Sequence, residues 1–288
     1  MLENVCGLVT LFFPDFSVAV NMLKLQKQVS FIVLIDNTPN ADNVELFKDL
    51  TDFLYIRNNV NLGLSAAFNK ALNIEQVQNF DFIIFFDQDS SVQDNLVHTL
   101  LRDYDNLVKK SLKVGCIGPA YFELNANKLM LPRSKKLLCD GVYSVKSIIT
   151  SSMLVKYSDI KQIGFWNEDL FLDLADWDLC WRFQKEGYLC CLSTNTYLIH
   201  RLGATIKKSF FFSLREGSPI REYYQMRDAF QLICKSYTPL KIRMYFIFRL
   251  CVRPIVHLMF LPQRGLRGKY IFYGILDGFL GKKGVFSR

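Results

Sequence analysis

The stretch from Phe82 to Ser91, FIIFFDQDSS, constrains the fold of this chain more than any other. Five apolar residues that favour β structure end abruptly at Asp87, and Asp89 follows two positions later. A short apolar run bounded by polar residues is typical of a strand in a sheet that is covered on both faces. In open α/β sheets, ligands bind beyond the carboxyl ends of the strands. The pattern therefore predicts an α/β fold with a binding site at the two aspartates.

The same two carboxylates also predict a metal ligand. Asp87 and Asp89 alternate along an extended segment, so both side chains can point toward one object. Two convergent carboxylates repel each other unless a cation lies between them, and a hard divalent ion carrying substrate phosphates suits that position. We therefore expect Mg²⁺ or Mn²⁺ here. The alternative is that DQDS is only a polar turn and helix cap after a strand.

Length and charge bound the class of protein. The chain has 288 residues and is half hydrophobic, which is enough for one large α/β domain, or for one domain with an appendage. The net charge is +8, and most of the positive excess follows Arg201. A basic surface suits nucleic acid, anionic lipid or phosphate-bearing substrates. No nucleic-acid motif occurs, and the late Lys and Arg residues alternate with aromatic and aliphatic ones, which favours a membrane surface.

No segment is predicted to span a membrane or to direct export. The first 13 residues lack a basic region and a cleavage site, and are expected to form a core strand. The apolar stretch 245–261 is interrupted by Arg249, Arg253, Pro254 and His257, so an interfacial helix is expected instead of a spanning one. The eight cysteines show no C-x-x-C pair and no zinc spacing, which favours reduced core thiols in the cytoplasm.

Strands and helices alternate along the first two thirds of the chain, as in a parallel sheet. The polar, basic segment 125–140 is expected to be a surface excursion over the site. Strands are predicted at 5–13, 30–36, 51–57, 82–86, 114–121, 141–155 and 189–199, and helices at 16–28, 45–50, 92–110 and 158–163 and after residues 63, 175 and 219.

Further candidate contacts follow the other strands. Asp36 ends the second strand, where it can hydrogen-bond a base or a ribose, or form only an Asx-turn before Pro39. Asn61 and Gly63 lie in a loop that leads into a helix, and a helix N-terminus can receive a phosphate or a sugar hydroxyl. The loop matches neither the P-loop pattern nor the dinucleotide-binding pattern.

Three acids gather before a late helix. Asp173, Asp176 and Asp178 lie among Phe, Leu and Trp residues. Helix capping explains one or two of them, because the helix dipole stabilises carboxylates at an N-terminus. An acid in an apolar setting has a raised pKa and suits general-base catalysis, so we expect one of the three to be catalytic. His200 follows the next strand and is either a structural residue or a metal ligand.

Taken in order, these segments resemble a known family. The carrying motifs are VTxxFPD, IDN, NxGLSAAxN, FDQDS, DLFLDxxDWDLCWR, IHxxG, SPIRxYY and GILDG. The set resembles the family-2 inverting glycosyltransferases of the GT-A fold, and most closely the bacterial rhamnosyltransferases that build O-antigen and other surface polysaccharides. The resemblance implies a Rossmann-like, mostly parallel sheet flanked by helices. It also implies a catalytic domain at 1–215 and a helical, membrane-surface extension at 216–288.

The resemblance assigns roles to the candidate residues. Asp36 matches an acid that contacts the nucleotide base, and Asp87 lies near the ribose or the metal. Asp89 and His200 match metal ligands. Asp176 matches the catalytic base, although relatives differ in which acid of this cluster has that role. In addition, Arg221, Tyr223 and Tyr224 match a segment near the donor diphosphate and the acceptor.

The implied reaction moves L-rhamnose from dTDP-L-rhamnose to a lipid-linked glycan, on the cytoplasmic, inner face of the cell membrane. Two alternatives remain open. The same fold can use UDP-galactofuranose, UDP-glucose or UDP-N-acetylglucosamine, because donor choice depends on loop shape. A non-catalytic, membrane-associated scaffold can also keep the fold. The acceptor, the linkage, the metal and the oligomeric state are not predicted by the sequence.

Overall fold

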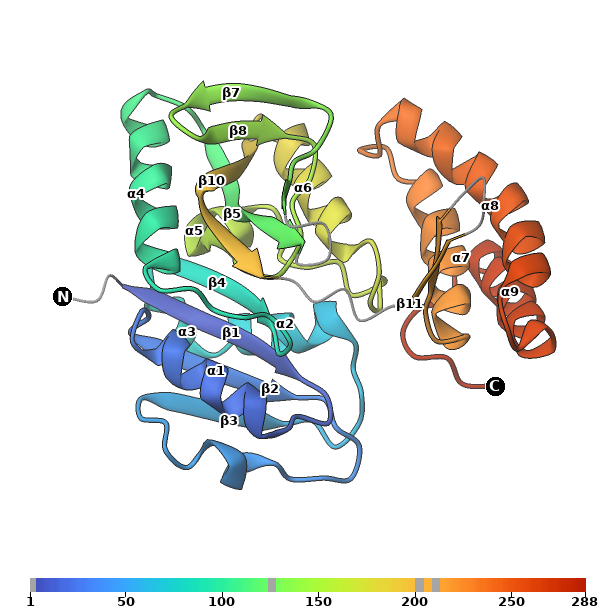
Figure 1. Cartoon of the computed structure of the whole chain (residues 1–288), viewed down its shortest axis with the longest axis horizontal. Coiled ribbons are helices and arrows are strands. Elements are labelled where there is room, and N and C mark those ends of the chain that lie inside the picture. Colours follow the sequence, from blue (N-terminus) through green and yellow to red (C-terminus); the bar gives the residue numbers. More distant parts are fainter. Residues whose placement is uncertain (1–3, 124–127, 200–204, 209–212) are drawn as a thin grey trace.

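The structure is a computed structural model that describes residues 4–123, 128–199, 205–208 and 213–288. The first half of the chain alternates strands and helices, as predicted (Figure 1). Its elements are β1 (Val5–Leu11), α1 (Phe16–Gln26), β2 (Phe31–Asp36), η1 (Val44–Phe47), β3 (Phe53–Arg57), α2 (Leu64–Leu72), α3 (Glu75–Gln78), β4 (Phe82–Asp87), α4 (Leu96–Lys109), β5 (Val114–Glu123), β6 (Lys128–Met130) and β7 (Lys135–Cys139).

The second half completes the sheet and ends in helices. The long helices at the end lie together on one side of the sheet-containing part (Figure 1). These elements are β8 (Val142–Val145), β9 (Met153–Lys156), α5 (Tyr157–Gln162), α6 (Ala175–Lys185), β10 (Leu189–Ile199), β11 (Thr205–Lys208), β12 (Ser213–Glu216), α7 (Ile220–Ile233), α8 (Leu240–Phe260) and α9 (Arg264–Phe279).

The main sheet has the strand order β3-β2-β1-β4-β9-β5-β10-β8-β7, with β6 paired to β5. Strands β3, β2, β1 and β4 are mutually parallel, and so are β5 and β10. The pairings of β9, β8, β7 and β6 are antiparallel, so the sheet is mixed. Because β1, β2 and β4 are parallel neighbours, their carboxyl ends meet at one edge, where Asp87 ends β4.

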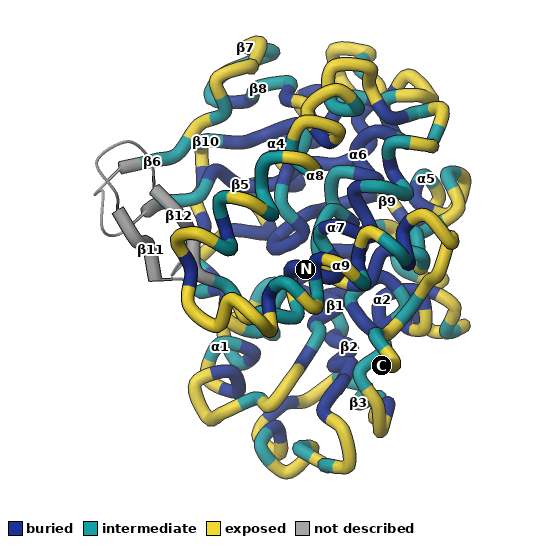
Figure 2. The backbone as a smooth tube through the Cα atoms, turned by 90° about the vertical axis from the view of Figure 1, so that its right-hand side faces the viewer, coloured by how far each residue is buried: buried dark blue, intermediate teal, exposed yellow. Residues whose placement is uncertain are grey.

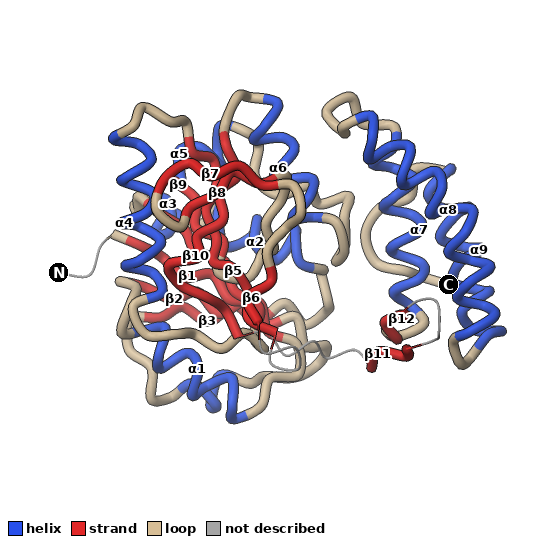
Figure 3. The backbone as a smooth tube through the Cα atoms, turned by 45° about the horizontal axis from the view of Figure 1, so that its top comes forward, coloured by secondary structure: helices blue, strands red, loops and turns tan. Residues whose placement is uncertain are grey.

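Alternate side chains of the strands enter two separate cores, as the pleat requires. On β4, Ile83 and Phe85 pack against α2, α5 and α6, whereas Ile84 and Phe86 pack against α1 and α4. Figure 3 shows the strands between these two groups of helices. Both faces are therefore covered, which explains why the apolar run of β4 shows no alternation with polar residues.

Two predicted segments differ from the structure. Residues 45–50 were expected to form a helix, but only the 3₁₀ turn Val44–Phe47 forms in the connection between β2 and β3. The basic segment 125–140 supplies β6 and β7. Strand β7 is an edge strand of the sheet, where exposed lysines discourage pairing with another chain.

The three C-terminal helices are joined by a buried charge cluster. Glu222 on α7 contacts Arg253 at 3.0 Å and His257 at 2.8 Å on α8, and Arg267 at 3.1 Å on α9. Hydrogen bonds and charge from these groups outweigh burial and lower the pKa of Glu222 to about 2. The predicted helical extension therefore forms, while its boundary as a domain at residues 215/216 stays a prediction. Among the described residues, no helix has the length and apolar character to cross a membrane.

Candidate functional site

The turn after β4 is held in place by neighbouring strands. Gln88 pairs with the end of β1 in both directions, because its side-chain oxygen accepts from the amide of Phe12 at 2.7 Å and its nitrogen donates to the Phe12 carbonyl at 2.9 Å. Ser151 donates a hydrogen bond of 2.5 Å to Ser90. The side chains of Asp87 and Asp89 have no hydrogen-bond or ion-pair partner in the described part of the chain. Both carboxylates therefore remain available to a ligand.

Electrostatic interactions link this turn to residues 169–178, which lead into the first turn of α6 and are called the acidic segment below. Burial, followed by the charge of Asp89, raises the pKa of Asp87 to about 7. Burial is also the main reason that the pKa of Asp176 rises to about 8, with further contributions from Cys180, Asp173 and Asp87. Asp176 and Asp87 are thus close enough for their charges to interact. That the two acidic motifs share one site stays a prediction.

Asp176 is the one acid of this cluster that has no side-chain partner among the described residues. Asp173 forms an ion pair with Arg221 at 2.5 Å and accepts a hydrogen bond from Gln225 at 2.9 Å. The fully buried Asp178 accepts hydrogen bonds from Asn167, Arg182 and Tyr237. Among the described residues, Asp176 accepts only from the adjacent backbone amide of Trp177, at 2.8 Å.

This difference in partners separates structural acids from a candidate base. A carboxylate held by an arginine is already neutralised, while an unpaired one in an apolar setting keeps its affinity for a proton. Asp176 is therefore the acid of this cluster that best suits proton transfer.

The unpaired acids fit a hard divalent cation. Asp87 and Asp89 offer oxygen ligands, and their mutual repulsion would be relieved by a positive charge. Within the described residues, no three carboxylates lie close enough to enclose an ion by themselves. Mg²⁺ typically uses one or two carboxylates and completes its coordination with substrate phosphates and water. The predicted ligand His200 lies outside the described residues.

The Gly63 loop packs directly on the acidic segment. Gly63 has φ +81°, and a Cβ at this position would lie 2.4 Å from the carbonyl oxygen of Phe171. The next amide, that of Leu64, donates to the same oxygen at 2.7 Å. Asn61 accepts from the amide of Gly63 at 2.9 Å. Only glycine fits here, because both its positive φ and the close backbone approach exclude a side chain.

Helix α7 also packs against this segment, through Phe171. The rings of Phe171 and Tyr224 stack with centroids 4.3 Å apart and an interplanar angle of 13°. Tyr223, the other predicted tyrosine, donates to Asp277 on α9 at 3.0 Å and so has a structural partner. Phe171 of the acidic segment therefore contacts both the Gly63 loop and Tyr224 near the start of α7.

Asp36 is less accessible than the sequence predicted. It is fully buried, and its carboxylate accepts hydrogen bonds from the amide of Thr38, the side chain of Asn43 and the hydroxyl of Tyr55. The Asx-turn alternative is thus present, and a base would have to replace one of these donors. The role of Asp36 in base recognition stays a prediction.

Two residues near Asp173, Gln225 and Arg249, were not among the predicted site residues. Arg249 on α8 donates to the side-chain oxygen of Gln225 at 2.8 Å, and Gln225 bonds Asp173. Burial lowers the pKa of Arg249, and no described acid forms an ion pair with it. In the sequence, Arg249 is only an interruption of an apolar stretch. The spacing of Arg221 and Gln225, one helical turn apart, was the available signal for Gln225.

Comparisons with known proteins agree with this architecture. Residues 19–126 match the family model described as Glycosyl transferase family 2. The dTDP-rhamnosyl transferase RfbF of Shigella flexneri is 26% identical over 252 residues, which cover 83% of this chain and 83% of that protein.

A solved structure shares the fold. The crystal structure of GalNAc-T7 with UDP, GalNAc and Mn²⁺ has a TM-score of 0.55 and 11% identity, and the match covers 91% of this chain and 58% of that chain. This chain thus spans less than two thirds of that structure's length, and the likeness concerns the fold alone. The chain is therefore similar in residues 19–126 to the family-2 glycosyltransferases, similar over most of its length to a rhamnosyl transferase, and shares the fold of a solved glycosyltransferase structure.

Proposed function

We propose that this glycosyltransferase moves L-rhamnose from dTDP-L-rhamnose to a lipid-linked glycan during the synthesis of a bacterial surface polysaccharide. The donor proposal is supported by the similarity to the dTDP-rhamnosyl transferase RfbF. The observation that carries the catalytic proposal is the unpaired Asp176, whose pKa is raised to about 8 beside Asp87. The site residues are proposed on this basis, with Asp176 as the base.

The proposed reaction is a single displacement. Asp176 removes the proton from an acceptor hydroxyl, whose oxygen forms a bond to the anomeric carbon of the sugar. The bond from that carbon to the diphosphate oxygen breaks on the opposite face, and the nucleoside diphosphate leaves with the electron pair. The anomeric configuration inverts. A base with a pKa near the working pH is efficient because it is partly deprotonated and still binds the proton strongly.

Charge at the leaving group needs compensation. Asp89, together with Asp87, would hold Mg²⁺ or Mn²⁺, and a bound divalent ion stabilises the negative charge of a departing diphosphate. Arg221 is half-exposed and Arg249 lacks an acidic partner in the described residues, so both guanidinium groups can contribute to binding a diphosphate. Asn61 and Gly63 present the N-terminal end of α2 for the same purpose.

The C-terminal helices would bind the membrane surface. Apolar side chains on α8 and α9 are widely exposed, and basic residues accompany them; Figure 2 shows these helices facing the viewer. The exposed apolar residues are Leu240, Met244, Tyr245, Ile247, Phe248, Ile255, Met259, Leu266, Phe272, Ile275 and Phe279, and the exposed basic residues include Lys241, Arg264 and Lys269. An apolar face with flanking cations binds the anionic surface of a bilayer. We place the protein on the inner face of the cell membrane.

The decisive experiment is mass spectrometry of the product formed from a defined lipid-linked acceptor. We expect addition of one deoxyhexose from dTDP-L-rhamnose, and none of the other sugars from UDP-galactofuranose, UDP-glucose or UDP-N-acetylglucosamine. Transfer from one of the UDP sugars would replace the proposed donor. Absence of both transfer and donor hydrolysis with every donor would favour the scaffold alternative.

A further inference from the structure

Three buried cysteines meet in the core beneath α6. Cys116 lies on β5, Cys180 on α6 and Cys190 on β10, and all three side chains are at most 1% exposed. Cys116 and Cys190 are direct neighbours in the parallel β5–β10 pair. The three Sγ atoms all lie within 4.8 Å of one another, and those of Cys116 and Cys180 are 4.0 Å apart. Among the described residues, no other group of three such side chains is as close.

This spacing matches thiolates that share one metal ion. A thiophilic ion such as Zn²⁺ binds sulfur at about 2.3 Å, which places tetrahedral ligands about 3.8 Å apart, and a larger ion such as Cd²⁺ separates them further. A disulfide requires sulfur atoms about 2.05 Å apart, so these thiols are too distant to be oxidised as they stand. All of the cysteines that the structure describes are free.

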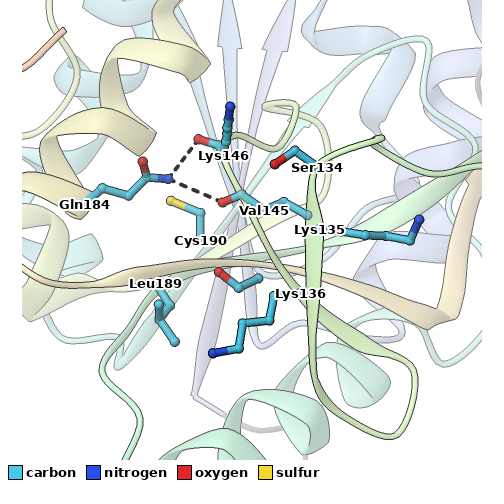
Figure 4. Close-up of a pocket in the computed structure, with 9 residues that line it drawn as sticks. Ser134, Lys135, Lys136, Val145, Lys146, Gln184, Leu189 and Cys190 are labelled. Atoms are coloured by element: carbon cyan, nitrogen blue, oxygen red, sulfur yellow. Dashed lines mark hydrogen bonds between the residues drawn. The ribbon is translucent and has the colours of Figure 1, made fainter. Parts of the chain in front are cut away.

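A cavity adjoins the cluster at Cys190. Cys190 lines a cavity of about 340 Å³ together with Gln184 and the β7–β8 hairpin (Figure 4). Gln184 donates to the backbone carbonyls of Val145 and Lys146, at 3.4 and 2.8 Å, and lines the cavity beside Cys190. The lysines that line this cavity are Lys135, Lys136 and Lys146. The thiolate is the form of cysteine that binds a metal.

We propose that Cys116, Cys180 and Cys190 form a three-thiolate site for a thiophilic divalent cation, of the Zn²⁺ and Cd²⁺ class. Binding would release the thiol protons and join β5, β10 and α6 through one ion. Hydrogen bonds from the other two thiols lower the pKa of Cys190, whereas burial raises the pKa of Cys116, so metal binding must displace the proton of Cys116. The site is separate from the proposed Asp89 site, whose oxygen ligands suit harder ions.

The test uses reduced, metal-free full-length protein that carries Cys234→Ser and Cys251→Ser, because those two exposed thiols would bind cadmium on their own. Titration with Cd²⁺ should produce the ultraviolet sulfur-to-cadmium charge-transfer band, which saturates at one ion per chain. The melting temperature should rise at the same stoichiometry. Mg²⁺ should produce neither change.

Matched variants decide whether the cluster is responsible. Cys180→Ala and Cys116→Ser should each lose the saturable band and the melting shift. Cys191→Ala should keep both, since Cys191 is buried next to Cys190 on the same strand but packs into the opposite core. Absence of the band in the parent protein, its persistence in both cluster variants, or its equal loss in Cys191→Ala would overturn the proposal. Circular dichroism identifies any variant that fails to fold. None of these readouts depends on glycosyl transfer.

Discussion

Arg221 forms an ion pair of 2.5 Å with Asp173, although the two residues come from separate parts of the chain. The pair neutralises the acid that precedes the unpaired Asp176 by three positions. Without this ion pair, both Asp173 and Asp176 would be candidates for the base at the start of α6. With it, Asp176 is the acid of this cluster that combines a raised pKa with a lack of cationic partners among the described residues.

Replacing the candidate base should abolish transfer but leave donor binding intact. We expect Asp176→Asn to lower kcat by at least ~10²-fold, which is the usual contribution of a general base. The dissociation constant of dTDP-L-rhamnose, measured by calorimetry, should change little, since Asp176 acts on the acceptor. Asp173→Asn is the comparison, and it should affect substrate binding more than turnover. Normal turnover of Asp176→Asn would exclude this residue as the base.

The pH dependence follows from the direction of the same pKa. Because folding raises the pKa of Asp176 from its ordinary acidic value to about 8, the folded state keeps a proton that the unfolded state loses. Its stabilising contribution is complete below about pH 4 and is lost as pH rises through about 8. Activity should show the opposite trend, because a base must be deprotonated, so kcat/KM should rise toward pH 8.

Thermal melting tests the stability part of this prediction. In metal-free protein, Asp176→Asn should melt at a higher temperature than the parent protein at pH 8.5, by about a few degrees, and the difference should shrink toward pH 5. A difference that does not depend on pH would mean that the carboxyl group is not strained by burial.

Metal-dependent donor binding should depend on Asp89. We expect Asp89→Ala to weaken Mn²⁺-dependent binding of dTDP by about tenfold or more, because a metal ligand and its charge are both removed. Asp94 is an exposed acid in the same connection, and Asp94→Ala should bind as the parent protein does. Calorimetric titrations with and without Mn²⁺ measure both. Equal metal dependence in Asp89→Ala and the parent would contradict the proposed role.

The Gly63 loop should tolerate no side chain. Gly63→Ala should lower the free energy of unfolding by about 2–4 kcal/mol, since it combines backbone strain with a collision against the Phe171 carbonyl. Gly164 is the matched control, because it also has positive φ but nothing lies within 4 Å of its Cβ position. Gly164→Ala should cost only about 1–2 kcal/mol. Urea denaturation of both variants measures the difference, and equal costs would contradict the packing argument.

Membrane binding should depend on the exposed face of α8 and α9. We expect the double substitution Phe248→Asp and Phe279→Asp to reduce sedimentation with vesicles of anionic phospholipid by about tenfold or more, because charge replaces inserted apolar surface. Phe16 is equally exposed but lies on α1, and Phe16→Asp should sediment as the parent protein does. Equal sedimentation of all three proteins would remove the membrane from the proposed function.

Much of the fold follows from local pattern. The apolar run of β4, the strand–helix alternation around it and the helix after Gly63 all depend on residues near in sequence, and the structure contains each of them. The failed helix at 45–50 shows the limit of such reasoning, because the short local pattern did not distinguish an α-helix from the 3₁₀ turn that forms. The mixed direction of the sheet was equally invisible, since strand direction depends on the path of the whole connection.

The sequence by itself determined which chemistry this protein can perform, because the identity and order of its acids, its Gly63 loop and its apolar strands do not depend on tertiary contacts. Only the tertiary structure decided which of these groups remain available. Asp36 and Asp173 are occupied by neighbours, Asp176 has no cationic partner among the described residues, and three distant cysteines share one place in the core. The physical reason is that hydrogen bonds, ion pairs and burial join residues from separate elements, and no local pattern specifies those pairings.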